Sequence, residues 1–162
     1  MGEPSCHAWN PSLSQYLVYG ASSSVGLFAI QVAKMLGYKT IAVCSPHNFD
    51  LVKSYGATET VDYHNEDECI ETIKKISGGG VKIGMDTISE GKSFEIAAKS
   101  FAEGGGRLNA ILWPTDEQKV RKDVEIVTTL MYSFFGKVSW LGSVSSPRLF
   151  PSFPLVLHTG SE

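Results

Sequence analysis

The sequence has few of the residues that build disulfide frameworks, metal sites or membrane spans. Its three cysteines, Cys6, Cys44 and Cys69, are an odd number without C-x-x-C spacing, which argues against disulfides and favours a reducing, cytoplasmic setting. The four histidines stand apart from one another without metal-ligand spacing, so we expect no zinc site. No apolar run is long enough to cross a membrane, and the first residues do not form a signal peptide.

Charged residues are also scarce, and neither sign dominates. They make up 19% of the 162 residues, with a net charge of −3, which gives no reason to expect a nucleic-acid partner. The hydrophobic content of 43% is that of a globular protein, and the length suits one domain with its own core.

The most informative stretch is residues 16–37, where a short apolar run ends in a turn of small residues and a helical pattern follows. Val25, Phe28 with Ala29, Val32 and Leu36 would line one face of that helix. A strand, a tight turn and a helix form the first unit of a dinucleotide-binding fold, in which the N–H groups at the helix start bind a pyrophosphate.

The glycine pattern of this turn is incomplete. The usual motif is G-x-G-x-x-G, whereas here Gly20 and Gly26 bracket Ala21 and three serines. An ordinary strand-to-helix turn is therefore the alternative. Residues 39–44 then read as a second buried strand, which completes a β-α-β unit and favours the dinucleotide interpretation.

The residues after this second strand bear on the choice of nucleotide. An NAD site places a carboxylate there to bind the ribose 2′-hydroxyl, but this chain has no acid until Asp50. Hydroxyl, amide and imidazole groups stand there instead and favour NADPH, although His47 has a solvated loop histidine as its alternative. Asn48 is the expected N-cap of a helix over 49–55 that Gly56 ends.

The rest of the chain repeats the alternation of strands and helices. Such alternation predicts an α/β protein with a Rossmann-type, doubly wound parallel sheet in a single domain. The expected elements are a short strand and turn at 60–63, a helix with a capping box at Asn65 that runs to Ile76, a strand at 81–86, a helix at 93–101, and strands at 107–112 and 124–130.

Three segments carry a family resemblance: LVYGASSSVGLFAIQVAKMLGY, AVCSPHNFDLVKSYGATETVDYH and the strand end MDTI. They resemble the cofactor domain of the medium-chain dehydrogenase/reductase superfamily. Within it the chain is most similar to zinc-independent enoyl reductases and quinone-reductase-like enzymes, above all the trans-acting enoyl reductases of fungal polyketide pathways. The resemblance runs from about Trp9 to Gly136.

The resemblance implies an NADPH-dependent oxidoreductase that transfers hydride to an α,β-unsaturated thioester or carbonyl, with a polyketide synthase as partner. It also implies which residues contact the cofactor. The pyrophosphate would be held by Ser22, Ser23, Ser24 and Val25, the 2′-phosphate by Ser45, Pro46, His47, Asn48 and Tyr63, and the nicotinamide would lie near Ile111 and Leu112.

The chain departs from that family at both ends. Residues 1–15 look like a linker entering the nucleotide-binding domain at 16–136, so we expect the GroES-like catalytic domain to be absent and assign no catalytic residue. Residues 137–162 are rich in Ser and Pro and show no periodicity. We interpret this tail as the product of an altered splice or a misjudged gene boundary, with an ordinary variable terminus as the alternative.

Three functional interpretations follow. The chain is an enoyl-reductase-type oxidoreductase, or a dinucleotide-binding fragment of one without turnover, or a short-chain dehydrogenase. The third requires a Tyr-x-x-x-Lys pair, and no tyrosine of this chain, Tyr132 included, has a lysine four residues later.

Overall fold

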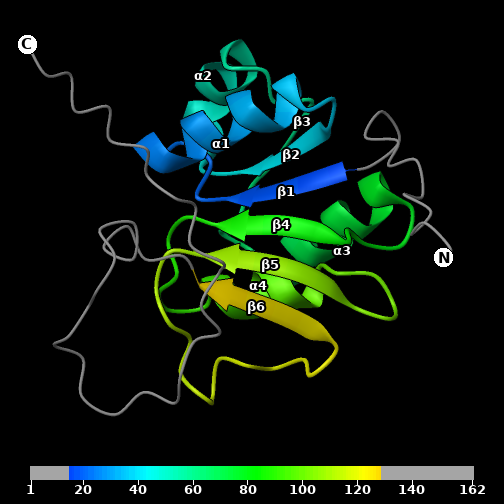
Figure 1. The fold of residues 1–162 in the computed structure, drawn as a ribbon. Coiled ribbons are helices and arrows are strands. Elements are labelled where there is room, and N and C mark those ends of the chain that lie inside the picture. Colours follow the sequence, from blue (N-terminus) through cyan, green and yellow to red (C-terminus); the bar gives the residue numbers. More distant parts are fainter. Residues whose placement is uncertain (1–14, 129–162) are drawn as a thin grey trace, which may run out of the picture. The chain divides into compact units, whose positions relative to one another are not determined.

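The computed structural model describes residues 15–128, which form one parallel six-stranded sheet with helices on both faces (Figure 1). The strands are β1 (Gln15–Tyr19), β2 (Lys39–Val43), β3 (Glu59–Val61), β4 (Ile83–Asp86), β5 (Gly106–Ala110) and β6 (Val124–Thr128). The helices are α1 (Ser24–Met35), the short 3₁₀ helix η2 (Pro46–Asn48), α2 (Phe49–Ser54), α3 (Glu66–Ser77) and α4 (Ser93–Lys99).

The strand order is β3-β2-β1-β4-β5-β6. From β1 the chain first winds outward through β2 and β3, then returns to pair β4 with the other side of β1. Connections therefore leave β1 and β4 in opposite directions, and this arrangement opens a crevice at the carboxyl ends of these strands. The doubly wound parallel sheet predicted from the sequence is confirmed.

Side chains alternate between the two faces of the sheet and build two cores. Val18 of β1 and Ala42 of β2 pack with Ile30 of α1 and Val52 of α2. The neighbouring Leu17 packs into the other cluster, which α3 and α4 cover. Figure 1 shows α1 and α2 on one face and α3 and α4 on the other.

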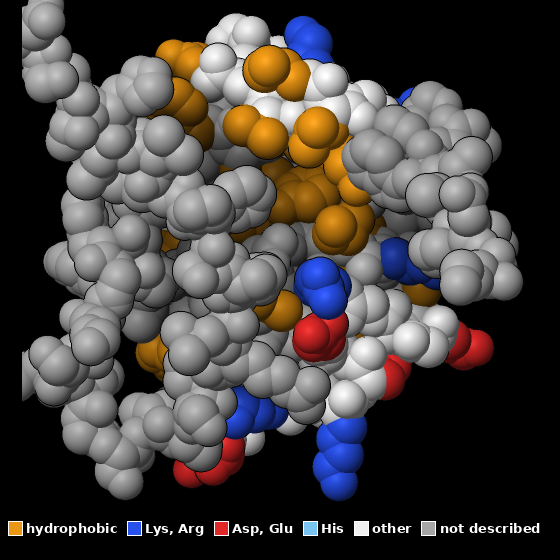
Figure 2. All heavy atoms as spheres, in the orientation of Figure 1, with side chains coloured by type: hydrophobic (Ala, Val, Ile, Leu, Met, Phe, Trp, Pro, Cys, Tyr) orange, Lys and Arg blue, Asp and Glu red, His pale blue; other side chains and the backbone are white. Residues whose placement is uncertain are grey.

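Helix α1 is apolar on nearly every side, and the face predicted from its spacing is the exposed one. Gly26, Ile30 and Ala33 face the sheet, whereas Phe28 is 69% exposed and Val32 is 52% exposed. The close approach of α1 to the β1–α1 turn at Gly26 explains why this face is buried: a Cβ on Gly26 would lie 2.5 Å from the carbonyl oxygen of Gly20. Figure 2 shows hydrophobic side chains gathered in the upper part of the view, where Figure 1 places α1 and α2.

Most helix boundaries follow the sequence signals. The Asn65 side chain caps α3 by accepting from the backbone N–H of Glu68, as the capping box predicted. Asn48 does precede α2, but its side chain makes no capping hydrogen bond. The reason is that η2 runs directly into α2, so the backbone at Asn48 is not extended as an N-cap requires.

The later strands are shorter than the sequence suggested. β4 begins at Ile83, because Val81 forms only an isolated bridge with Phe101. β5 ends at Ala110, so Ile111 and Leu112 lie just beyond its carboxyl end. The end of the predicted last strand, like the tail at 137–162 and the linker-like residues 1–14, lies outside the described residues.

Candidate functional site

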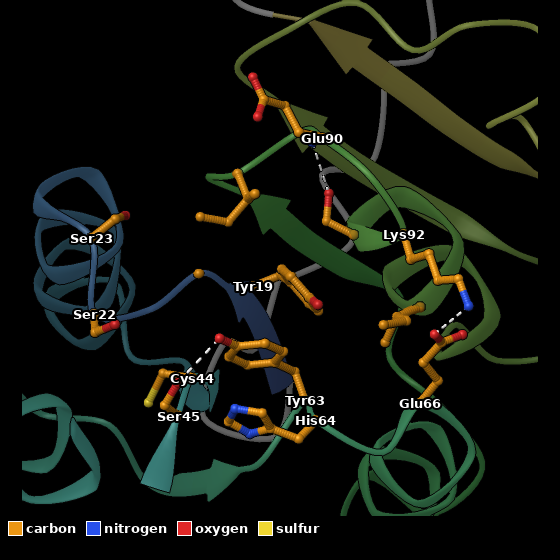
Figure 3. Close-up of a pocket in the computed structure, with 14 residues that line it drawn as sticks. Tyr19, Ser22, Ser23, Cys44, Ser45, Tyr63, His64, Glu66, Glu90 and Lys92 are labelled. Atoms are coloured by element: carbon orange, nitrogen blue, oxygen red, sulfur yellow. Dashed lines mark hydrogen bonds and ion pairs between the residues drawn. The ribbon is translucent and has the colours of Figure 1, made fainter. Parts of the chain in front are cut away.

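A pocket of about 630 Å³ lies over the carboxyl ends of β1, β2, β3 and β4 (Figure 3). This is the crevice that the strand order creates. Its lining combines hydroxyls, an imidazole, an ion pair and a few apolar side chains. The lining residues are Tyr19, Gly20, Ser22, Ser23, Cys44, Ser45, Tyr63, His64, Glu66, Ile88, Glu90, Lys92, Ser93 and Ile96.

The turn between β1 and α1 is fixed by backbone geometry at Gly20. This residue has φ +73°, and a Cβ on it would lie 2.5 Å from the side chain of Ile88 and 2.6 Å from the hydroxyl of Thr87. Only glycine therefore fits here without moving the opposite wall of the pocket. The N–H groups of Ser24 and Val25, in the first turn of α1, have no carbonyl one turn earlier in the helix, and N–H groups of this kind at a helix start can bind an anion.

The hydroxyl of Ser23 holds this turn in place. It accepts from the backbone N–H of Gly26 at 3.0 Å and so caps α1. It also lies 2.9 Å from the hydroxyl of Thr87, which in turn donates to the carbonyl oxygens of Tyr19 and Gly20. Because the single Thr87 proton is directed at these carbonyls, Ser23 is the donor in the Ser23–Thr87 bond.

A buried carboxylate supports the opposite wall. Asp86 is fully buried and accepts from the backbone N–H groups of Ile88 and Ser89 through Oδ1, and from the Ser93 hydroxyl through Oδ2. Burial raises the pKa of Asp86, while these hydrogen bonds act in the opposite direction. The carboxylate thus fixes the loop that carries Thr87 and Ile88 to the pocket.

A hydroxyl pair lies where β2 and β3 end. Ser45 donates to the phenol oxygen of Tyr63 at 3.1 Å. The Tyr63 ring stacks on the His64 ring, with centroids 4.6 Å apart and planes 16° from parallel. Nδ1 of His64 lies 2.5 Å from Oδ1 of Asp62, and this bond lowers the pKa of Asp62.

The far side of the pocket carries an ion pair. Nζ of Lys92, just before α4, lies 2.5 Å from Oε1 of Glu66, at the start of α3. Figure 3 shows this pair across the pocket from Ser22 and Ser23. The ion pair thus links the start of α3 to the residue just before α4.

The two described thiols do not fit the role of a nucleophile. Cys44 lines the pocket but is buried, and burial raises its pKa. Cys69 is fully buried, and the same effect raises its pKa to about 12. Among residues 15–128, no three His, Cys, Asp or Glu side chains lie close enough together to bind a metal ion. Within the same range, no helix is both long and apolar enough to span a bilayer.

The structure brings some of the residues predicted for the site together and leaves others outside the pocket lining. Ser22, Ser23, Ser45 and Tyr63 line the pocket. The remaining residues lie close by in the chain but are not among its lining residues: Ser24 and Val25 in the first turn of α1, Pro46, His47 and Asn48 in η2, and Ile111 and Leu112 after β5. The last pair lies near the pocket wall, since Ile111 donates its N–H to Ser89, which also bonds to Asp86.

Sequence reasoning gave no role at this site to several residues that shape it, among them Thr87, Ile88, His64 and Lys92. For Thr87 and Ile88 a signal existed, because they directly follow a strand that neighbours β1 in a sheet of this type. His64 had a weaker signal, as the residue after Tyr63. Lys92 had none, since its position depends on the fold of the loop before α4.

Comparison with known proteins points to one family. A family model described as zinc-binding dehydrogenase matches residues 24–158. The trans-enoyl reductase ACTTS2 of Alternaria alternata is 44% identical over 124 residues, which are 76% of this chain and 35% of that protein. The trans-enoyl reductase TOXD of Cochliobolus carbonum is 34% identical over 144 residues, 89% of this chain and 46% of that protein. The chain thus spans about a third to a half of the length of these relatives.

Solved structures share the fold. The CurK enoyl reductase aligns with a TM-score of 0.64 at 23% identity, over 75% of this chain and 37% of that chain. A mycobacterial protein solved in complex with NADPH aligns with a TM-score of 0.65 at 22% identity, over 80% of this chain and 43% of that chain.

Proposed function

The chain belongs to the zinc-binding dehydrogenase family, and we propose that it forms the NADPH-binding domain of an enoyl-reductase-type oxidoreductase. The observation that carries the proposal is the pocket itself. It lies at the point where the strand order reverses, it opens beside the N-terminus of α1, and the Ser45–Tyr63 hydroxyl pair lies in its wall. The family is named for zinc, but residues 15–128 contain no group of side chains that could bind a metal ion. We therefore assign no metal-binding role to any of these residues.

Each part of the cofactor has matching groups on the chain. The first turn of α1 suits the pyrophosphate, because its N–H groups and helix dipole favour a dianion. Ser22, Ser24 and Val25 are the residues proposed to contact it, with Ser23 fixing the turn. Ile88, which is 41% exposed at the pocket wall, offers an apolar surface to the adenine ring.

The 2′-phosphate is assigned to the segment after β2. Ser45 and Tyr63 supply hydroxyls, and the residues of η2, Pro46, His47 and Asn48, follow directly. No carboxylate stands between the end of β2 and Asp50, so nothing in that segment repels a phosphate or favours the free 2′-hydroxyl. This is the basis for proposing NADPH over NADH.

The reaction assigned to the full enzyme is reduction of an α,β-unsaturated thioester or carbonyl. Bound NADPH supplies the hydride, and Ile111 and Leu112, after β5, are the residues proposed to lie near the nicotinamide. The described residues include no group that we can assign to activating the substrate carbonyl. We therefore propose that this chain alone binds NADPH without turnover. The resemblance to trans-acting enoyl reductases extends the proposal to a polyketide synthase partner. The cysteine pattern of the sequence supports a cytoplasmic location.

Titration of the purified chain with NADPH and with NADH, followed by cofactor fluorescence, tests the proposal. Saturable binding with NADPH preferred is the expected result. A matched control is Gly20→Val, which puts a side chain where a Cβ alone would already lie 2.5 Å from Ile88 and 2.6 Å from Thr87. If neither nucleotide binds to a chain whose circular dichroism shows a folded α/β protein, the proposed function is wrong.

A further inference from the structure

The segment after β3 places an imidazole beside the hydroxyl pair of Ser45 and Tyr63. His64 lines the pocket, and its ring stacks on Tyr63, whose phenol oxygen accepts from Ser45. Figure 3 shows the His64 ring next to Tyr63 and on the same side of the pocket as Ser45. A ligand group that binds the two hydroxyls therefore lies within reach of the imidazole edge.

Asp62 determines which nitrogen of His64 faces a ligand. Its Oδ1 accepts from the backbone N–H of His64 at 3.1 Å and from Nδ1 of the same residue. An ionised carboxylate only accepts, so Nδ1 carries the proton and Nε2 is the nitrogen left for a ligand. Because the bond lowers the pKa of Asp62, this carboxylate stays ionised throughout the neutral range.

Of the basic side chains that line the pocket, His64 is the one beside the hydroxyl pair. Among the residues that line the pocket, the basic side chains are those of His64 and Lys92. Lys92 is paired with Glu66, so the charges of these two groups offset each other on the far side. The titratable groups in contact with His64 are Asp62, to which it is hydrogen-bonded, and Tyr63, on which its ring stacks. The carboxylate of Glu90 and the buried thiol of Cys44 also line the pocket.

The other described histidine is less well placed. His47 is exposed on η2 and is not among the residues that line the pocket. The sequence alone favoured His47, because it lies in the segment that follows β2, two residues after Ser45. The pocket instead favours the histidine that follows β3.

We propose that His64, oriented by Asp62, is a specificity-determining residue that binds the 2′-phosphate of NADPH through Nε2. This inference rests on the proposed function. It adds a cationic contact to the neutral hydroxyls of Ser45 and Tyr63, and charge-assisted bonds to phosphate are stronger than neutral ones. The contact requires the protonated imidazole, in which Nε2 also carries a hydrogen to donate to the phosphate, so the preference for NADPH over NADH is expected to be stronger at lower pH.

The test compares wild type, His64→Gln, His64→Arg and His47→Gln by titration with NADPH and NADH at pH 6 and pH 8. At pH 6, His64→Gln is expected to lower NADPH affinity about tenfold and to leave NADH affinity unchanged. His64→Arg, which keeps a cation at both pH values, is expected to retain the preference at pH 6 and also at pH 8. The 2′-phosphate itself gains charge over this range, so each variant is compared with wild type at the same pH.

The outcomes separate the two proposals. Wild-type chain that binds neither nucleotide overturns the proposed function. Wild-type chain that prefers NADPH, together with a His64→Gln variant that keeps the full preference, overturns the role of His64 alone. A loss seen in His47→Gln and not in His64→Gln assigns the phosphate contact to η2 instead. His64 and His47 are both exposed, so these variants are expected to fold.

Discussion

The hydroxyl of Ser23 lies 2.9 Å from that of Thr87, although 64 residues separate them in the chain. Ser23 caps the helix that begins at the proposed pyrophosphate site, and Thr87 follows the strand next to β1. The bond therefore joins the two walls of the pocket at its base. Through it, the geometry of the β1–α1 turn depends on the loop after β4.

We expect Thr87→Val to loosen the turn without unfolding the chain. The substitution keeps the shape of the side chain but removes the hydrogen bonds to Ser23 and to the carbonyls of Tyr19 and Gly20. A loss of about 1–3 kcal/mol in the free energy of unfolding is expected. NADPH affinity should fall about fivefold, the equivalent of ~1 kcal/mol. Chemical denaturation and fluorescence titration measure the two effects, with Thr115→Val, at an exposed threonine, as the control.

Two substitutions of Asp86 test whether its site requires a hydrogen-bond acceptor or a negative charge. Asparagine can accept the N–H groups of Ile88 and Ser89 through Oδ1 and donate to the Ser93 hydroxyl through Nδ2, so Asp86→Asn is expected to be tolerated. Asp86→Ala leaves three buried donors without a partner and should cost about 3 kcal/mol or more. Equal losses for the two variants would show that the charge itself is required.

The difference in stability between the wild type and Asp86→Asn should depend on pH. Burial raises the pKa of Asp86 in the folded chain, so the folded state binds the proton more tightly than the unfolded state does. The wild type should therefore gain stability relative to Asp86→Asn as the pH falls through this raised pKa, with the full gain reached below the ordinary value of 3.8. Urea denaturation of both proteins at several pH values between 7 and 4 measures the difference, and a change of opposite sign contradicts the prediction.

The two faces of α1 should respond differently to truncation. Ile30 is fully buried, and Ile30→Ala is expected to cost about 2–5 kcal/mol through lost burial and the cavity left behind. Phe28 is larger but 69% exposed, so Phe28→Ala should change stability by about 0.5 kcal/mol or less. Thermal denaturation compares them. A larger loss at Phe28 would mean that the helix turns its other face to the sheet.

A negative charge at Ser45 should act on nucleotide choice. Ser45→Asp places a carboxylate beside the Tyr63 hydroxyl and is expected to lower NADPH affinity relative to NADH about tenfold through repulsion of the 2′-phosphate. Ser54→Asp adds the same charge on the exposed part of α2 and serves as the matched control. If both variants leave the ratio of the two affinities unchanged, Ser45 does not belong to the phosphate site.

Much of the fold could be predicted because its signals are local. The turn at Gly20, the capping box at Asn65 and the alternation of apolar segments with helical patterns each depend on a few neighbouring residues. The family resemblance, which the comparisons confirm, rests on the same segments. The ends of β4 and β5 could not be predicted as well from the sequence. The length of each strand depends on how far its neighbour in the sheet continues the hydrogen bonding.

The site was predicted only in part, because its residues come from four strand ends. Ser22, Ser23, Ser45 and Tyr63 each follow a recognisable strand, and all four line the pocket. Thr87 is bonded to Ser23, 64 positions earlier in the chain, and Lys92 to Glu66, 26 positions earlier. No local sequence pattern indicates such contacts.

The sequence by itself determined the type and order of the helices and strands, since periodicity and turn chemistry are properties of short segments. The tertiary structure alone decided which face of α1 is buried and which histidine reaches the pocket. Only Lys34 is charged along α1, so hydrophobicity cannot orient the helix; the close contact at Gly26 does so. His64 reaches the pocket because the sheet places the end of β3 beside that of β2, where Tyr63 meets Ser45.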